Sequence, residues 1–113
     1  MEEITKEIPH LIKLGFDRRI CAFIEIARHP EGLTINELIP KLQCGKMSVW
    51  FHIKPLLENN LIIGRRMVRN GRKSKVFKAT PYGINSVKNE MKPLCELFGA
   101  IEKEMVKNEN GDE

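Results

Sequence analysis

Apolar side chains recur every three or four residues along much of the chain, a spacing that places them on one face of a helix. Asp17 and Pro30 bound the clearest such stretch, so we expect a helix over residues 16–29. Its apolar stripe consists of Ile20, Phe23, Ile24 and Ala27. A second stretch, residues 1–14, has Pro9 inside the pattern, and predicts an N-terminal helix that starts near Pro9 or is kinked there.

Two short helices are predicted next. Thr34 and Glu37 have the spacing of a capping box, in which each side chain accepts a hydrogen bond from the backbone N–H of the other. Pro40 should make the helix that follows short or bent, and we expect Gly45 to adopt a left-handed conformation in the turn after it. A further helix is expected from about residue 46 to 59. Short helices joined by a turn containing glycine form a helix-turn-helix signature.

A β-hairpin should follow these helices. Asn70-Gly71 stands between apolar runs, and this dipeptide favours a type I′ turn because both central residues need positive φ. The strands are expected at about 61–68 and 75–80. A two-residue loop would place Gly64 opposite Phe77 and Ile62 opposite Ala79.

The C-terminal part carries an apolar seam with alternating spacings of three and four residues, typical of a helix that packs against another helix. We expect Pro93 to bend or split this helix after about Met91, and the polar residues after 107 to fray. The seam is predicted to form a dimer; the alternative is that Pro93 turns the last segment back onto the chain's own first helix. The dimerisation residues would be Ile84, Val87, Met91, Leu94, Phe98, Ile101 and Met105.

Positive charge is concentrated in one region. Residues 59–89 contain no Asp or Glu, although the formal net charge of the whole chain is only +4. The clustered cations are Arg65, Arg66, Arg69, Arg72, Lys73, Lys75 and Lys78. Such a cluster is self-repelling without a partner, and it favours a phosphate backbone at the hairpin tip over a merely solvated surface.

Composition narrows the class of protein. At 113 residues and 42% apolar content the chain should form one domain. It has no apolar run long enough for a membrane span and no signal-peptide pattern at its start, so we expect a cytoplasmic protein. Cys21, Cys44 and Cys95 show no metal-ligand spacing and are expected to be ordinary small apolar residues, with redox sensing at Cys44 or Cys95 as the alternative. We expect no metal, no cofactor and no enzymatic activity.

Three segments resemble the winged helix-turn-helix regulators of bacteria and archaea, of the ArsR and MarR type. They are LTINEL at 33–38, SVWFHIKPLLENNLI at 48–62 and TPYG at 80–83. The resemblance implies a mainly α fold with a β-hairpin wing (α+β), and a short strand at 32–34. The resemblance covers about residues 17–87. Together with the patterns described above, it divides the chain into an N-terminal helical extension (1–15), a winged-helix DNA-binding domain (16–81), a C-terminal dimerisation helix (82–107) and a disordered tail (108–113). The Cys-x-Cys pair of ArsR-type metal sensors is missing, and MarR-type proteins are usually longer.

The helix predicted over 46–59 would be the recognition helix. Its apolar positions leave Met47 and Phe51 on the outer face, where they could contact thymine methyl groups or bind protein. The alternative for Phe51 is that it packs beneath the wing or a neighbouring loop. Trp50 is expected mostly buried at the core edge and His52 to be a structural residue. The predicted DNA-binding residues are Lys46, Met47, Ser48, Phe51, Lys54, Arg65, Arg66, Arg69, Arg72, Lys73 and Lys75.

The sequence thus predicts a homodimeric transcription regulator that binds double-stranded DNA, with the recognition helix in the major groove and the basic wing on the backbone. Two alternatives stay open. One is a winged-helix module that binds proteins of the transcription machinery, and the other is a repressor that senses a ligand or redox state.

Overall fold

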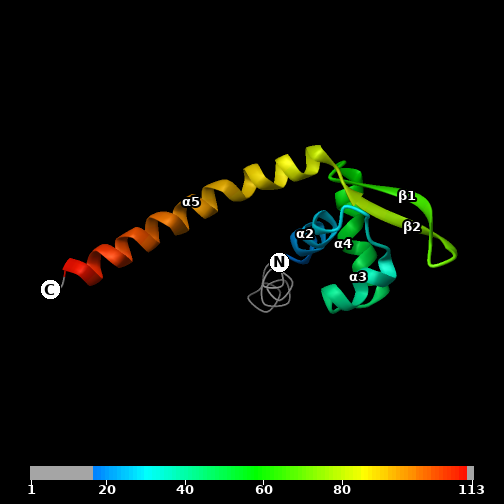
Figure 1. The fold of residues 1–113 in the computed structure, drawn as a ribbon, viewed down its shortest axis with the longest axis horizontal. Coiled ribbons are helices and arrows are strands. Elements are labelled where there is room, and N and C mark those ends of the chain that lie inside the picture. Colours follow the sequence, from blue (N-terminus) through cyan, green and yellow to red (C-terminus); the bar gives the residue numbers. More distant parts are fainter. Residues whose placement is uncertain (1–16, 112–113) are drawn as a thin grey trace.

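The computed structural model describes residues 17–111, and side chains up to residue 108. Its elements run in the order helix, helix, helix, hairpin, helix (Figure 1). They are α2 (Arg18–Arg28), α3 (Ile35–Leu42), α4 (Lys46–Glu58), β1 (Ile62–Arg69), β2 (Arg72–Ala79) and α5 (Pro81–Gly111). The predicted N-terminal helix of residues 1–14 lies outside the described residues. The predicted fold class, a mainly α protein with a β-hairpin wing, is confirmed.

The core lies where α2, α3 and α4 meet the base of the hairpin (Figure 1). The buried faces of α3 and α4 are the ones that their apolar spacing predicts. In α2 the prediction was wrong for three of the four stripe residues: Phe23 is buried, but Ile20, Ile24 and Ala27 are only half-buried. The face of α2 that meets the core is instead formed by Cys21, Ala22, Phe23 and Ile26. The buried apolar residues are Cys21, Ala22, Phe23, Ile26, Leu33, Leu38, Leu42, Val49, Ile53, Leu56, Ile62, Val76 and Phe77. Because both strands contribute to this core only at their base, the outer half of the hairpin projects from the body.

The capping box at α3 is formed as predicted: the Thr34 N–H donates to Glu37 Oε1 (2.8 Å) and the Glu37 N–H donates to Thr34 Oγ1 (3.2 Å). The helix is short, eight residues with Pro40 in its last turn. The prediction for the turn after it was wrong in one respect. Gln43, not Gly45, is left-handed, with φ 55°, because the C-cap position directly after Leu42 falls on Gln43. Gly45 is instead the extended N-cap of α4, with φ −78°.

The hairpin has the predicted turn and register. Asn70 and Gly71 both have positive φ (55° and 76°), and Gly64 pairs with Phe77. The strands extend to the turn itself, further than predicted. A β-bridge between Leu33 and Phe77 adds the expected short strand beside β2, with N···O distances of 3.0 and 2.8 Å in the two directions.

The step from the wing into α5 depends on a close backbone approach. The Thr80 hydroxyl donates to the carbonyl of Asn60 (2.8 Å) and accepts from the N–H of Gly83 (2.8 Å). Gly83 is buried so close to the carbonyl of Leu61 that a Cβ at this position would overlap it. This glycine is therefore required by packing.

Helix α5 is continuous through Pro93, so the predicted split after Met91 is wrong. The helix runs to Gly111 and includes residues 108–111, which we expected to fray; the last two residues of that tail lie outside the described residues. Pro93 and Asn89, whose carbonyl loses its helical partner, are both exposed, so water can satisfy that carbonyl. Figure 1 shows α5 leading away from the body, which contradicts the alternative in which Pro93 turns the last segment back. The outer seam stays exposed on the single chain, from 39% at Leu94 to 59% at Met105.

Candidate nucleic-acid interface

Helix α4 is fixed in the body by one face and presents the other to solvent. Val49 and Ile53 are fully buried and anchor the inner face. Met47 and Phe51 are each 73% exposed, and Lys54 is also exposed. The prediction that Met47 and Phe51 point away from the core is confirmed, and the alternative in which Phe51 packs beneath the wing is contradicted by its exposure.

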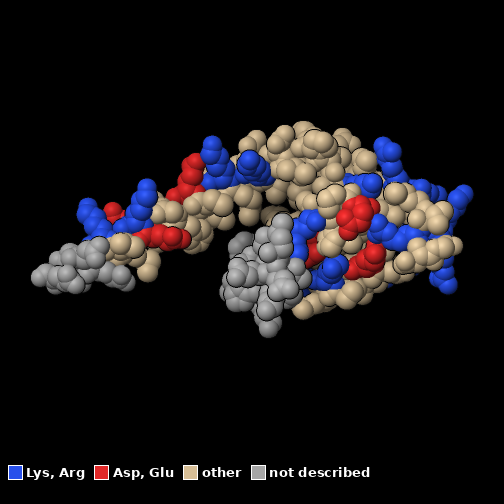
Figure 2. Space-filling model, in the orientation of Figure 1, with Lys and Arg blue, Asp and Glu red and all other residues tan. Residues whose placement is uncertain are grey.

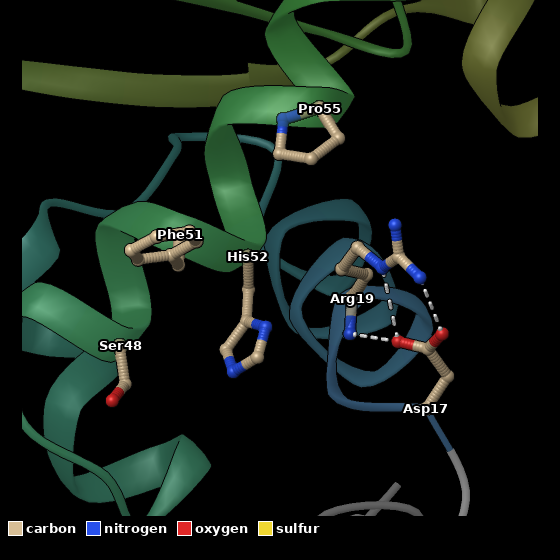
Figure 3. A pocket seen from close by; sticks show the side chains of 6 residues that line it. All are labelled: Asp17, Arg19, Ser48, Phe51, His52 and Pro55. Atoms are coloured by element: carbon tan, nitrogen blue, oxygen red, sulfur yellow. Dashed lines mark hydrogen bonds and ion pairs between the residues drawn. The ribbon is translucent and has the colours of Figure 1, made fainter.

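A shallow hollow of about 510 Å³ separates the outer face of α4 from the start of α2. It is lined by Asp17, Arg19, Ser48, Phe51, His52 and Pro55 (Figure 3). In Figure 3 the His52 ring points into the space between the two helices, while Asp17 and Arg19 pair with each other on the α2 side. Trp50 keeps 37% of its surface exposed, so its ring is less buried than we expected.

The charges in this hollow are largely compensated. Hydrogen bonds from the Arg19 side chain and backbone (3.2 and 2.7 Å) hold the pKa of Asp17 below its ordinary value. Burial, together with the nearby positive charge of Arg18, lowers the pKa of His52. His52 is therefore neutral at pH 7, and it can offer a hydrogen bond but no positive charge.

The hairpin register sorts the wing cations onto two faces. Arg66 lies directly opposite Lys75, and Val68 opposite Lys73. Because directly opposed side chains share a face, these residues lie on the same face as Phe77. None of the ion pairs within the described residues involves these three cations. Like charges opposite one another destabilise a hairpin, so this face favours a polyanionic partner.

Lys75 is held in place more firmly than a free surface lysine. Its ammonium nitrogen lies 5.8 Å from the centre of the Phe77 ring, within the range of a cation–π interaction. A Cβ at Gly64 would come within 2.8 Å of Lys75 Cε, so the missing side chain makes room for the lysine stem. The position of the Lys75 side chain is thus set by Phe77 and Gly64.

Arg69 differs from Arg66, Lys73 and Lys75 because its guanidinium group forms hydrogen bonds with other parts of the protein. Nη1 donates to Glu37 Oε1 (2.7 Å) and to the carbonyl of Gly32 (2.9 Å), and Nη2 donates to the carbonyl of Glu31 (3.0 Å). The side chain is only 20% exposed. Arg69 therefore ties the outer end of β1 to the first turn of α3.

Glu37 has two functions in this tie, since the same Oε1 also caps α3. Burial acts to raise the pKa of Glu37, but the hydrogen bonds from the Thr34 backbone and the Arg69 side chain, with the positive charge of Arg69, outweigh it and lower the pKa. The carboxylate is therefore charged and compensated at neutral pH.

The space-filling view shows where the basic side chains gather on the surface (Figure 2). In Figure 2 Lys and Arg side chains surround the projecting end of the hairpin without carboxylates between them, whereas the helical part shows carboxylates and basic side chains side by side. Basic charge is thus presented at the end of the molecule opposite to the direction of α5.

Several solved structures have a fold similar to that of this chain. A transcriptional regulator homologue from Pyrococcus horikoshii OT3 has a TM-score of 0.66 and 22% identity, covering 89% of this chain and 98% of that chain. Staphylococcus aureus MarR in complex with salicylate and kanamycin has a TM-score of 0.62 and 20% identity, covering 90% and 66%. S. aureus MepR in a complex with DNA has a TM-score of 0.54 and 18% identity, covering 94% and 93%. No protein-family model and no curated protein sequence matches the chain.

The chain has the winged-helix fold of MarR-type regulators. In this winged helix, α3 and α4 form the helix-turn-helix, and β1 and β2 form the wing. The structure also brings together residues that sequence reasoning did not select. Asn36 and Ser74 lie beside the basic residues between α3 and the wing. The capping box could have placed Asn36 in the first turn of a helix, but nothing in the sequence pointed to Ser74.

The three cysteines differ in their exposure to solvent. Cys21 is fully buried, Cys44 is half-buried against the core and Cys95 is exposed on α5. Among the described residues, no three metal-ligating side chains are grouped around a possible ion. None of the helices in residues 17–111 combines the length and the apolarity that crossing a membrane requires.

Proposed function

We propose that this protein is a non-enzymatic transcription regulator of the cytoplasm that binds double-stranded DNA as a homodimer. The single observation that carries the proposal is the uncompensated cation face of the wing, Arg66, Lys73 and Lys75, beside the exposed outer face of α4 on a winged-helix scaffold. A structure of MepR with DNA, on the same fold, supports duplex DNA as the partner.

The two elements would have different tasks. The exposed side chains of α4 from Met47 to Lys54 would enter the major groove, with Phe51 and Met47 against thymine methyl groups and Ser48 on a base edge or phosphate. The wing cations would contact phosphates and so position the protein without reading sequence. We assign Arg69 to holding the wing, because its donors are already engaged.

The exposed seam of α5 supports a homodimer. Phe98 and Ile101 are 55% and 42% exposed, on a helix whose outer part has no cover in the described chain. Covering apolar surface stabilises by roughly 25 cal/mol per Å², and an equivalent seam on a second copy is the simplest cover. A two-fold dimer would present two recognition helices to half-sites about 34–36 Å apart.

Binding to a duplex at different salt concentrations tests the proposal. Four to six phosphate contacts per protomer should lower affinity by about a hundredfold to a thousandfold per protomer between 50 and 200 mM salt. Selection of bound sites from random duplex DNA should return a palindromic motif. Affinity that stays constant across this salt range would show that the basic wing does not meet phosphate, and would favour the alternative of a protein-binding module that uses Phe51.

Replacing both Arg72 and Lys73 by Ala separates the tasks of the two elements. Affinity should fall about equally for all sequences, and the salt dependence should become shallower, because wing cations contact the backbone. If the variant lost its preference for one site instead, the wing would be reading bases and the assignment of tasks would be wrong.

A further inference from the structure

A groove of about 230 Å³ lies between the first turn of α3, the start of α4 and the edge of β2. Its lining comes from three elements: Thr34, Ile35, Asn36, Lys46, Ser74 and Lys75. A second hollow of about 300 Å³ shares Thr34, Asn36 and Ser74 and continues toward Arg72 at the wing tip. The groove therefore connects the recognition helix with the wing.

The edge of β2 contributes a backbone donor to this groove. Leu33 and Phe77 pair through that edge in both directions. Backbone groups alternate in direction along a strand, so the N–H of Lys75, two residues earlier, points from the same edge. The chain leaves the bridge at Leu33 and turns into α3, so this N–H faces the first turn of α3 and has no neighbouring strand among the described residues.

The charge in the groove is positive. Lys46 and Lys75 line the groove from two different elements, and no carboxylate lines it. Within the described chain, none of the ion pairs involves either lysine. Glu37, which lines the adjoining hollow, has its charge compensated by Arg69 at 2.7 Å. Asn36 and Ser74 supply neutral hydrogen-bond donors.

The two walls are held at a fixed separation by contacts already described. Arg69 ties the wing to Glu37 and to the Gly32 carbonyl, on the α3 side of the groove. Phe77 and Gly64 direct the stem of Lys75 on the wing side. A site whose donors are ordered before binding loses less entropy when the ligand arrives.

We propose that this groove is a seat for one backbone phosphate of the bound DNA, shared by Lys46, Lys75, Asn36 and Ser74. The inference rests on the proposed function. A phosphodiester is singly charged and accepts hydrogen bonds on two free oxygens, which suits two ammonium groups together with neutral donors. Because the seat joins α4 to the wing, the phosphate it holds sets the register of the recognition helix along the groove of the DNA.

Salt dependence distinguishes one shared phosphate from two separate ones. Each phosphate contact contributes about 0.9 to the slope of log affinity against log salt concentration. Lys46→Gln and Lys75→Gln together should reduce the slope by about 0.9 in total if the lysines share a phosphate, and by about 1.8 if each binds its own. Lys103→Gln on α5 is the control for the loss of a lysine and should leave the slope unchanged.

Asn36→Asp tests the seat without disturbing the fold. The change keeps the shape of the side chain and adds a carboxylate in the first turn of α3, where negative charge stabilises a helix. The melting temperature should stay constant or rise, while DNA affinity falls about tenfold through repulsion of the phosphate. Asn89→Asp, the same change at an exposed position on α5, should alter neither quantity.

The outcomes separate the seat from the proposed function. A wild-type chain that binds no duplex would overturn both. A wild-type chain that binds, with a slope unchanged in the double-lysine variant or an affinity unchanged in Asn36→Asp, would overturn the seat alone. Inorganic phosphate should compete no better than chloride at equal ionic strength; strong competition would indicate a free-phosphate site and overturn the assignment to DNA.

Discussion

The tie between Arg69 and Glu37 can be tested by a double-mutant cycle. Arg69→Met removes the guanidinium and keeps an unbranched stem, and Glu37→Gln removes the charge while its amide oxygen can still accept from the Thr34 N–H. The two single variants and the double variant isolate the interaction between the side chains. Arg72→Met, directly across the hairpin from Arg69, is the control.

The expected size of the effect follows from the contacts. Arg69 loses two hydrogen bonds to backbone carbonyls and one to a carboxylate. A hydrogen bond contributes about 1 kcal/mol net, and less where water can replace it. The partners are 20% and 37% exposed, so solvent screens the ion pair. We expect Arg69→Met to cost about 1–2 kcal/mol of unfolding free energy, with a coupling to Glu37 of about 1 kcal/mol. Arg72→Met should stay within about 0.5 kcal/mol of the wild type.

Urea denaturation at one fixed protein concentration measures these free energies, since a dimer's stability depends on concentration. The coupling should depend on pH. The pKa of Glu37 is lowered in the folded chain from its ordinary value of 4.5, so the stabilisation is fully present above that value. It is lost as the pH falls through the folded pKa. A coupling indistinguishable from zero at pH 7, or one equally large at pH 2.5, would refute the tie.

Three further sets of substitutions test the packing at Gly83, the exposed position of Phe51 on the recognition helix and the dimer formed through α5. Gly83→Ala should lower the free energy of unfolding by about 2–4 kcal/mol in thermal denaturation, because the added methyl group overlaps a backbone carbonyl. Gly99→Ala, in open space on the same helix, should raise it by up to about 1 kcal/mol. Equal effects of the two substitutions would contradict the packing argument. Phe51→Ala should reduce discrimination at a T·A pair by about 1 kcal/mol in binding assays without lowering the melting temperature, and unfolding would contradict its exposed position. Phe98→Glu with Ile101→Lys should sediment as a folded monomer with weaker DNA binding; a native chain that is monomeric at tens of micromolar would rule out the dimer.

The sequence by itself determined the elements whose cause is local. Asn70-Gly71 specified the turn and with it the register of both strands, because positive φ at two adjacent residues selects a type I′ hairpin. Thr34 and Glu37 specified the start of α3, since the capping hydrogen bonds join residues only three apart. The outer face of α4 followed from its apolar spacing.

Only the tertiary structure decided which wing cations are available to a ligand. Arg69 looked equivalent to Arg72 in the sequence, but its partners lie 32 to 38 positions away and meet it only after the wing packs beside α3. Likewise Pro93 is tolerated because its neighbours on α5 are exposed. The phosphate seat has the same origin, since it needs donors from α3, α4 and β2 at once. Local pattern predicts the conformation of a segment, whereas the pairing of side chains from distant segments depends on how those segments pack.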